Sequence, residues 1–213
     1  MLEAKNLTYS YTKHDTLIFP DITCKRGEHW LLLGQSGSGK TTLLHLLAGL
    51  RKAPSGQILI DGRDITKMVE SSLDKFRGQN IGIIFQQAHF VRALTVRENL
   101  RLAQQLAGLK TDDQRITHIL ERLGIKHKAD SKPRRLSVGE QQRASIARAI
   151  INKPKLILAD EPTSALDDLH CDEVINLLKE QAIQDDITLL IVTHDNRLKS
   201  VFEKSVILQK QQI

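Results

Sequence analysis

The residues with the clearest chemical potential form a glycine-rich loop near the start of the chain. The loop is the run Gly34-Gln35-Ser36-Gly37-Ser38-Gly39-Lys40-Thr41. It follows an apolar segment, Trp30–Leu33, and precedes another, Thr42–Leu50. This spacing is typical of a phosphate-binding loop (P-loop) between a strand and a helix, because the glycines and the helix start present N–H groups to phosphate oxygens. We expect Lys40 to reach the outer phosphates, Thr41 to place its hydroxyl on Mg²⁺, and Thr42 to be a further phosphate donor.

A second apolar run ends abruptly in two carboxylates. Lys155–Ala159 reads as a short strand, and Asp160 and Glu161 follow it directly. Asp160 is placed to hold Mg²⁺ through water, and Glu161 to polarise a water that attacks the γ-phosphate. For the pair taken alone, a solvated strand end would be the better interpretation.

Two further polar residues also follow apolar runs. Gln86 comes after Ile81–Phe85, and His194 comes after Thr188–Val192. In a parallel α/β sheet, ligands bind beyond the carboxyl ends of the strands, so these ends predict one common site. There His194 could contact the γ-phosphate and orient the water or Glu161, and Gln86 could coordinate Mg²⁺ or the water. Elsewhere in a chain, a single histidine or a loop amide is more often structural or exposed.

The run Leu136–Arg143 begins a helix and allows two interpretations. Ser137 with Glu140 three residues later is a capping box, which needs no ligand. A helix start that carries Ser137 and Gly139 is also able to bind an anion. The residues themselves leave both interpretations open.

The elements that would position these residues alternate along the chain. We expect an α/β fold with a mostly parallel sheet, an N-terminal antiparallel β layer and a helical insert between Gln86 and Pro133. The expected strands are Leu2–Thr8, Thr16–Phe19, Ile22–Cys24, Ile58–Ile60, Ile81–Phe85, Leu156–Ala159, Thr188–Val192 and Val206–Leu208. The expected helices are Val96–Ala107 and Asp112–Leu123 in the insert, followed by Glu140–Ile151 and Leu169–Gln181.

Composition narrows the class of protein. The 213 residues are 40% hydrophobic and 26% charged, which is ordinary for a globular domain. No apolar run approaches the roughly 18 residues of a membrane helix, and Met1–Lys5 has no signal-peptide core, so we expect a cytoplasmic chain. Cys24 and Cys171 lack metal-ligand spacing and are expected to be reduced. The net charge of +6 is spread over scattered residues and only 4% are aromatic, so nucleic acid is not the expected partner.

The order of these stretches resembles that of the ATP-binding cassette (ABC) family of ATPases. Along the chain it runs P-loop, Gln86, Leu136–Glu140, Asp160–Glu161, Ser164–Asp167 and His194. The resemblance covers essentially the whole chain and implies one P-loop NTPase domain, residues 1–213, with a helical subdomain at about residues 87–150. It implies ATP hydrolysis with ATP and Mg²⁺ as cofactors. The implied catalytic set is Lys40, Gln86, Glu161 and His194, and the implied metal set is Thr41, Gln86 and Asp160.

In this family two cassettes pair head to tail, and each ATP lies between the P-loop of one and the signature residues of the other. The resemblance therefore places Ser137, Val138, Gly139, Glu140 and Gln141 on the opposite subunit's ATP. It also places Asp167 at the interface between subunits. The departure is Val138, where the commonest signature has a second glycine, whereas Gly139 is retained.

The resemblance also identifies a candidate for the adenine site. Tyr11 matches the aromatic residue that stacks on the base. Tyr9 is the alternative if the alignment shifts by two residues.

The resemblance implies a transporter subunit whose permease partners are separate membrane polypeptides. The chain would then sit on the cytoplasmic face of the inner (plasma) membrane. The chain looks most similar to cassettes of the lipoprotein-release, macrolide-export and cell-division type. Two features fit that group: the stretch Thr95–Asn99 and the expected lack of a C-terminal regulatory domain. A competing function is an ABC ATPase that acts with nucleic acid in repair or translation, but the sequence has neither a long coiled-coil or zinc insert nor a second cassette. A P-loop kinase or switch GTPase would leave Leu136–Glu140 and His194 unexplained.

Overall fold

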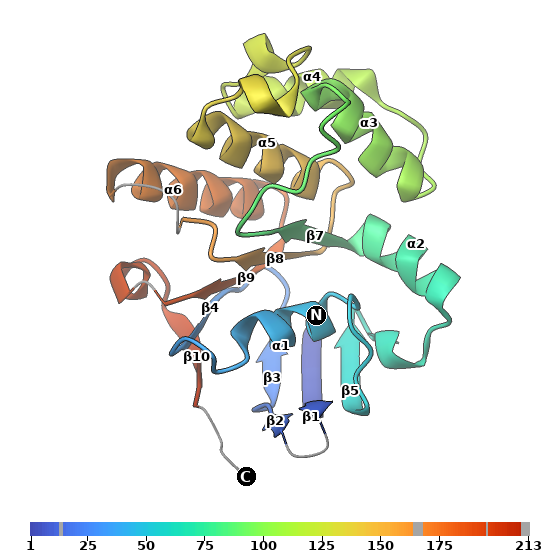
Figure 1. The fold of residues 1–213 in the computed structure, drawn as a ribbon, viewed down its shortest axis with the longest axis vertical. Coiled ribbons are helices and arrows are strands. Elements are labelled where there is room, and N and C mark those ends of the chain that lie inside the picture. The colour runs from blue at the N-terminus through green and yellow to red at the C-terminus, as the bar shows by residue number, and fades with distance from the viewer. Residues whose placement is uncertain (13–14, 164–167, 195, 210–213) are drawn as a thin grey trace.

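A parallel sheet forms the centre of the molecule (Figure 1). The computed structural model describes residues 1–12, 15–163, 168–194 and 196–209, and its parallel sheet has the strand order β10-β4-β9-β8-β7. The strands are β4 (His29–Gly34), β7 (Ile81–Ile84), β8 (Leu156–Asp160), β9 (Thr188–Thr193) and β10 (Lys204–Leu208). Neighbouring strands run parallel, so their carboxyl ends meet at one edge of the sheet.

An antiparallel sheet forms the N-terminal layer. Its strands are β1 (Leu2–Thr12), β2 (Asp15–Ile18), β3 (Ile22–Cys24), β5 (Ser55–Ile60) and β6 (Arg63–Asp64). Strand β1 pairs with β2, β3 and β5. The predicted end of the first strand at Thr8 is wrong, because Tyr9 and Ser10 pair with Leu17 and Thr16 of β2.

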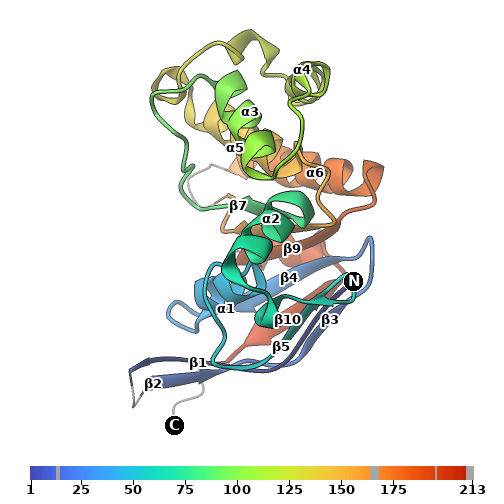
Figure 2. The same cartoon turned by 90° about the vertical axis from the view of Figure 1, so that its right-hand side faces the viewer.

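The parallel sheet separates two hydrophobic cores. Along β9, Leu189 and Ile191 belong to the core shared with the later helices, whereas Leu190 and Val192 belong to the core shared with the antiparallel sheet. This alternation is the period of two expected of a strand that is buried on both faces. Helix α1 (Lys40–Leu47), which follows the P-loop, packs into the second core between the two sheets (Figures 1 and 2).

The helices after β7 lie on the other side of the parallel sheet, the last two against the strands and the first two farther out (Figure 2). They are α3 (Val96–Leu106), α4 (Asp113–Arg122), α5 (Val138–Ile150) and α6 (Asp168–Gln184). Helix α5 lies directly on the backbone of β7. A Cβ atom at Gly82 of β7 would be only 2.4 Å from the carbonyl oxygen of Ala149, so the close approach requires glycine.

One α-helix was not predicted. Helix α2 (Glu70–Asn80) has Phe76 as its single buried residue, so its sequence shows no clear apolar period. Short 3-10 turns at Ile65–Lys67, Lys126–Lys128, Pro133–Arg135 and Asn196–Ser200 complete the described elements. Among the described residues, no helix is both long and apolar enough to cross a bilayer. The predicted fold class, with its antiparallel layer, parallel sheet and helical insert, is confirmed.

Candidate functional site

The P-loop joins β4 to α1 through backbone conformations that favour glycine. Gly37 and Gly39 have φ angles of +76° and +91°, in the left-handed region. A Cβ atom at Gly39 would also lie 2.9 Å from the Leu17 side chain of β2. The left-handed conformation therefore favours glycine at Gly39, and the Leu17 contact shows that the antiparallel layer lies against the loop.

Lys40 is buried at the start of α1 and points back into the loop. Its Nζ donates to the carbonyl oxygens of Gly34 and Gln35, each at 2.9 Å. The lysine is 7% exposed. An ammonium group held in this way over the loop is able to bind a phosphate without first being ordered.

Asp160 provides the observation that bears on a metal ion. The carboxylate ends β8, is 7% exposed, and has one oxygen, Oδ1, without a hydrogen-bond partner. Burial raises the pKa of this carboxyl, while a hydrogen bond with Thr41 opposes the rise. Mg²⁺ prefers hard oxygen ligands, so an unpartnered carboxylate oxygen beside the Thr41 hydroxyl fits such an ion.

The carboxylate of Glu161 connects the ends of three neighbouring strands. Its Oε1 accepts from His194 Nδ1 at 2.9 Å, and its Oε2 lies 3.5 Å from Gln86 Nε2. The residue itself has a φ of +44°, unusual for a side chain larger than glycine, and its N–H donates to the Val192 carbonyl at 2.8 Å. The structure thus brings together the three residues that the sequence placed at strand ends.

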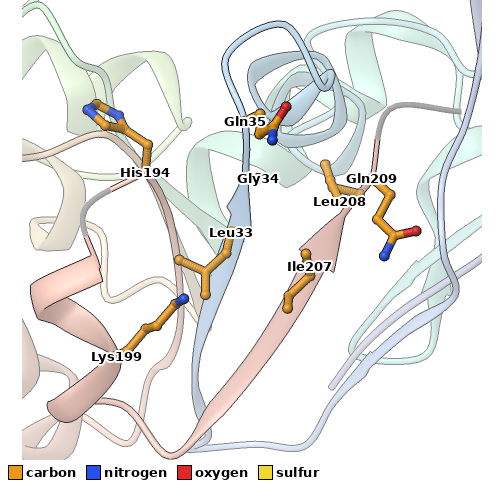
Figure 3. A pocket seen from close by; sticks show the side chains of 8 residues that line it. All are labelled: Leu33, Gly34, Gln35, His194, Lys199, Ile207, Leu208 and Gln209. Atoms are coloured by element: carbon orange, nitrogen blue, oxygen red, sulfur yellow. The ribbon is translucent and has the colours of Figure 1, made fainter.

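A hollow of about 500 Å³ opens beside the first residues of the P-loop (Figure 3). Its lining residues come from β4, β9 and β10 and the segments that follow them: Leu33, Gly34, Gln35, His194, Lys199, Ile207, Leu208 and Gln209. Lys199 was not singled out in the sequence. It lies on a 3-10 turn in an exposed position, and no pattern of residue types distinguished it from other surface lysines.

The start of α5 is capped within its own segment, and its Glu140 is also contacted by His127 and Lys128 of a preceding 3-10 turn. The Ser137 hydroxyl accepts from the Glu140 N–H at 3.2 Å, and Glu140 accepts from the Ser137 N–H at 2.8 Å. Gln141 donates to the Leu136 carbonyl at 3.1 Å, while Val138 is 58% exposed. The predicted capping box is therefore present, and the helix start still presents open surface at Val138 and Gly139. Asp167 lies outside the described residues.

The two candidate aromatic residues lie side by side on β1. Their rings meet edge to face, with centroids 5.0 Å apart. Tyr11 is 52% exposed, and its hydroxyl is hydrogen-bonded to the buried Thr42 hydroxyl of α1. The hydroxyl of Tyr9 instead accepts from Arg51, so Tyr11 is the tyrosine that reaches the P-loop helix.

Comparison with known proteins identifies the family. The sequence profile of the ABC transporter family matches residues 20–164. The chain belongs to the ABC transporter family. It is an ATP-binding and ATP-hydrolysing subunit of that family, as the predicted P-loop and paired carboxylates implied.

Relatives of this ABC ATPase match along nearly its whole length. It is 38% identical over 212 residues to the lipoprotein-releasing system ATP-binding protein LolD of Geobacter metallireducens, covering 97% of the chain and 94% of the relative. It is 36% identical over 219 residues to the bacitracin export ATP-binding protein BceA of Halalkalibacterium halodurans, covering 100% and 87%. The dimeric post-hydrolysis structure of the cassette MJ0796 bound to ADP and Pi has a TM-score of 0.87 and 32% identity, covering 99% and 95%. These relatives do not favour the nucleic-acid alternative.

Proposed function

We propose that this ABC ATPase pairs with a second copy around two ATP molecules and drives separate permease subunits in the membrane. The observation that carries the proposal is the contact of Glu161 with both His194 and Gln86 beside the P-loop. Glu161, His194 and Gln86 all come from one chain, whereas the start of α5 is capped and leaves Val138 and Gly139 open to a second molecule. The dimeric MJ0796 structure with ADP and Pi supports the pairing.

The contacts support a division of roles at the γ-phosphate. Lys40 would bind the outer phosphate oxygens, and Glu161 would accept a proton from the attacking water. The hydrogen bond from His194 would fix the direction of that carboxylate. Thr41, Asp160 and Gln86 would hold Mg²⁺, which would neutralise charge on the phosphates. Ser137 and Gly139 of the other copy would close the site from outside.

A size measurement tests the pairing. Glu161→Gln keeps the shape of the side chain but removes the general base, so Mg-ATP should remain bound and a dimer should accumulate. Static light scattering with and without Mg-ATP measures this. The matched control is Glu203→Gln, the same change at an exposed position, which should behave like the parent. A Glu161→Gln protein that binds ATP but stays monomeric at high concentration contradicts the pairing.

The loop after Gln86 is the surface we assign to the permease. Within it Phe90 lies under the guanidinium of Arg148 at 4.8 Å and packs against the core, while Val91 is 46% exposed. A partner that covered Val91 would remove from water the apolar area that this side chain now exposes. The names of the relatives, which describe lipoprotein release and bacitracin export, support a permease of the releasing or exporting kind at the cytoplasmic face of a membrane.

Copurification with membrane proteins in mild detergent tests this surface. Val91→Glu should reduce recovery of the permease while leaving ATP binding unchanged, because a charge would be buried in an apolar contact. Ile183→Glu is the control, since Ile183 is 65% exposed on α6 and lies outside the proposed surface. Equal recovery with both variants would argue that the loop does not contact a membrane partner.

A further inference from the structure

A cation lies over both tyrosines of β1. Arg51, four residues beyond the end of α1, places its guanidinium carbon 5.4 Å from the Tyr9 ring centroid and 5.6 Å from the Tyr11 centroid. The same guanidinium donates to the Tyr9 hydroxyl at 2.6 Å. These distances are those of cation–π contacts, and the hydrogen bond fixes which part of the guanidinium faces the rings. One arginine thus links the two tyrosines to the end of the P-loop helix.

Tyr11 is held at three places and remains half exposed. Tyr9 contacts its ring edge to face, Arg51 lies over it, and Thr42 is hydrogen-bonded to its hydroxyl. A tyrosine on an exposed strand would otherwise exchange between rotamers, and ordering it on binding would cost affinity. Here the ordering is already present in the free protein, and 52% of the residue's surface stays accessible.

The hydroxyl pair also connects the ring to the phosphate end of the site. A threonine hydroxyl has one proton to donate and two lone pairs that accept. If Tyr11 donates to Thr42, the Thr42 proton is left for a phosphate oxygen. The two hydrogen bonds then polarise each other in a chain. The hydrogen bond between the two hydroxyls thus orders the Tyr11 ring and directs the Thr42 proton towards the phosphates.

We propose that Arg51 and Tyr9 are positioning residues that fix Tyr11 as the stacking platform for the base of the nucleotide. The inference rests on the proposed placement of ATP on the P-loop. It assigns to Arg51 a contribution to base recognition, and none to binding of the phosphates. Neither residue touches the reacting atoms.

Comparing two ligands distinguishes base binding from phosphate binding. ATP has both the base and the phosphates, whereas inorganic tripolyphosphate has the phosphates alone. Arg51→Ala should weaken ATP about fivefold to tenfold, as expected for loss of a cation–π contact and a hydrogen bond that order the stacking ring. Tripolyphosphate affinity should stay within about twofold of the parent value, because the P-loop is intact. Equilibrium titration of the full chain measures both affinities. Tyr9→Phe, which keeps the ring but removes the acceptor for Arg51, should give a smaller loss for ATP.

Lys52→Ala is the matched control. It removes one positive charge at the next residue, which is also exposed and lines a hollow at the end of α1. The control should bind both ligands like the parent. An equal loss of ATP affinity in Arg51→Ala and Lys52→Ala would show a general charge effect and overturn the inference. A parallel loss of tripolyphosphate in Arg51→Ala would show that Arg51 acts on phosphates, and would overturn it as well.

Tyr9 and Tyr11 are the chain's two tyrosines, which gives a readout independent of affinity. With ¹³C-labelled tyrosine, the NMR spectrum should contain two sets of ring signals. ATP should shift the Tyr11 signals of the parent, and tripolyphosphate should shift them less. In Arg51→Ala the Tyr11 signals of the free protein should already have moved, and unchanged signals would overturn the inference. A parent protein that does not bind ATP would refute the proposed function itself, which separates the two failures.

Discussion

The P-loop region and the start of α5 both carry residues expected at ATP, but they are organised in opposite ways. Around the P-loop, contacts join residues far apart in the sequence, such as Glu161 with Gln86 and His194. At the start of α5, the reciprocal hydrogen bonds join Ser137 to Glu140, three residues away. The first region is therefore assembled by the whole fold. The second is capped mainly by its own residues, with added contacts from His127 and Lys128 to Glu140, and can present its outer surface to another molecule.

Two carboxyl groups show the same difference. The pKa of Glu140 is lowered, mainly because the Ser137 N–H donates to its carboxylate. The pKa of Asp160 is raised, mainly because the group is buried. The hydrogen bond of the helix cap stabilises the charged form of Glu140. At Asp160, the hydrogen bond with Thr41 only partly offsets the cost of burying the charge. Such incompletely compensated charge is typical of a binding site.

Loss of Lys40 should have the largest effect on the assembled region. Lys40→Ala removes a buried ammonium that is already directed at the loop, so ATP affinity should fall by about a hundredfold or more. Hydrolysis should fall to background while the circular dichroism spectrum stays the same. Titration with ATP and a phosphate-release assay measure the two effects. Hydrolysis near the parent rate would show that the P-loop has been wrongly assigned.

Glu161→Gln should separate turnover from binding within that region. Removing a general base is expected to reduce turnover by about 10²- to 10⁴-fold. ATP affinity should change little, since glutamine keeps the size of the side chain. Single-turnover hydrolysis compared with ATP titration checks this. If turnover falls less than tenfold, another group accepts the proton.

Ser137→Arg tests whether the second region has a role beyond capping. In a Glu161→Gln background, the arginine should abolish the ATP-dependent dimer by steric conflict, while each monomer still binds ATP. Ser137→Ala is the control, because it removes the cap at a cost of about 1 kcal/mol but adds no bulk. Light scattering should detect a dimer with alanine and a monomer with arginine. A dimer with both variants would leave Ser137 as a helix cap only.

Asp160→Asn should have the smallest effect of the four changes. It should stabilise the folded protein. The amide keeps the shape but removes a buried charge, so the free energy of unfolding without Mg²⁺ should rise by about 1 kcal/mol near pH 7. Because the folded-state pKa is raised above the unfolded value of 3.8, the parent's disadvantage should shrink as the pH falls below the folded-state pKa, and it should vanish below 3.8, where the carboxyl is protonated in both states. Thermal unfolding across this range checks the sign, and Asp186→Asn, at an exposed carboxylate, is the control.

The sequence predicted the site better where strands end than where side chains meet by tertiary contact. Gln86, Glu161 and His194 could be grouped because parallel strands end at one edge of a sheet. Helix α2 could not be predicted, since Phe76 alone is buried along it. Nor could the contact of Arg51 with Tyr9 and Tyr11, which depends on how the end of α1 lies over β1. The positive φ of Glu161 also has no sequence signal, because glutamate is not the residue that such a conformation favours.

The contact at Gly82 lies near one end of α5, so a small tilt there would cause a larger displacement at the other end of the helix. The helix contacts β7 at Ala149, near its C-terminal end, and Ser137 lies 12 residues, or about 18 Å, away at the other end. With that geometry, a rotation of about 10° at the contact would displace Ser137 by roughly 3 Å, the length of a hydrogen bond. A side chain at Gly82 would push the C-terminal end of α5 away from β7 and so tilt the helix. The position of Ser137 relative to a second molecule would therefore depend in part on the contact between Gly82 and Ala149, which leaves no room for a side chain.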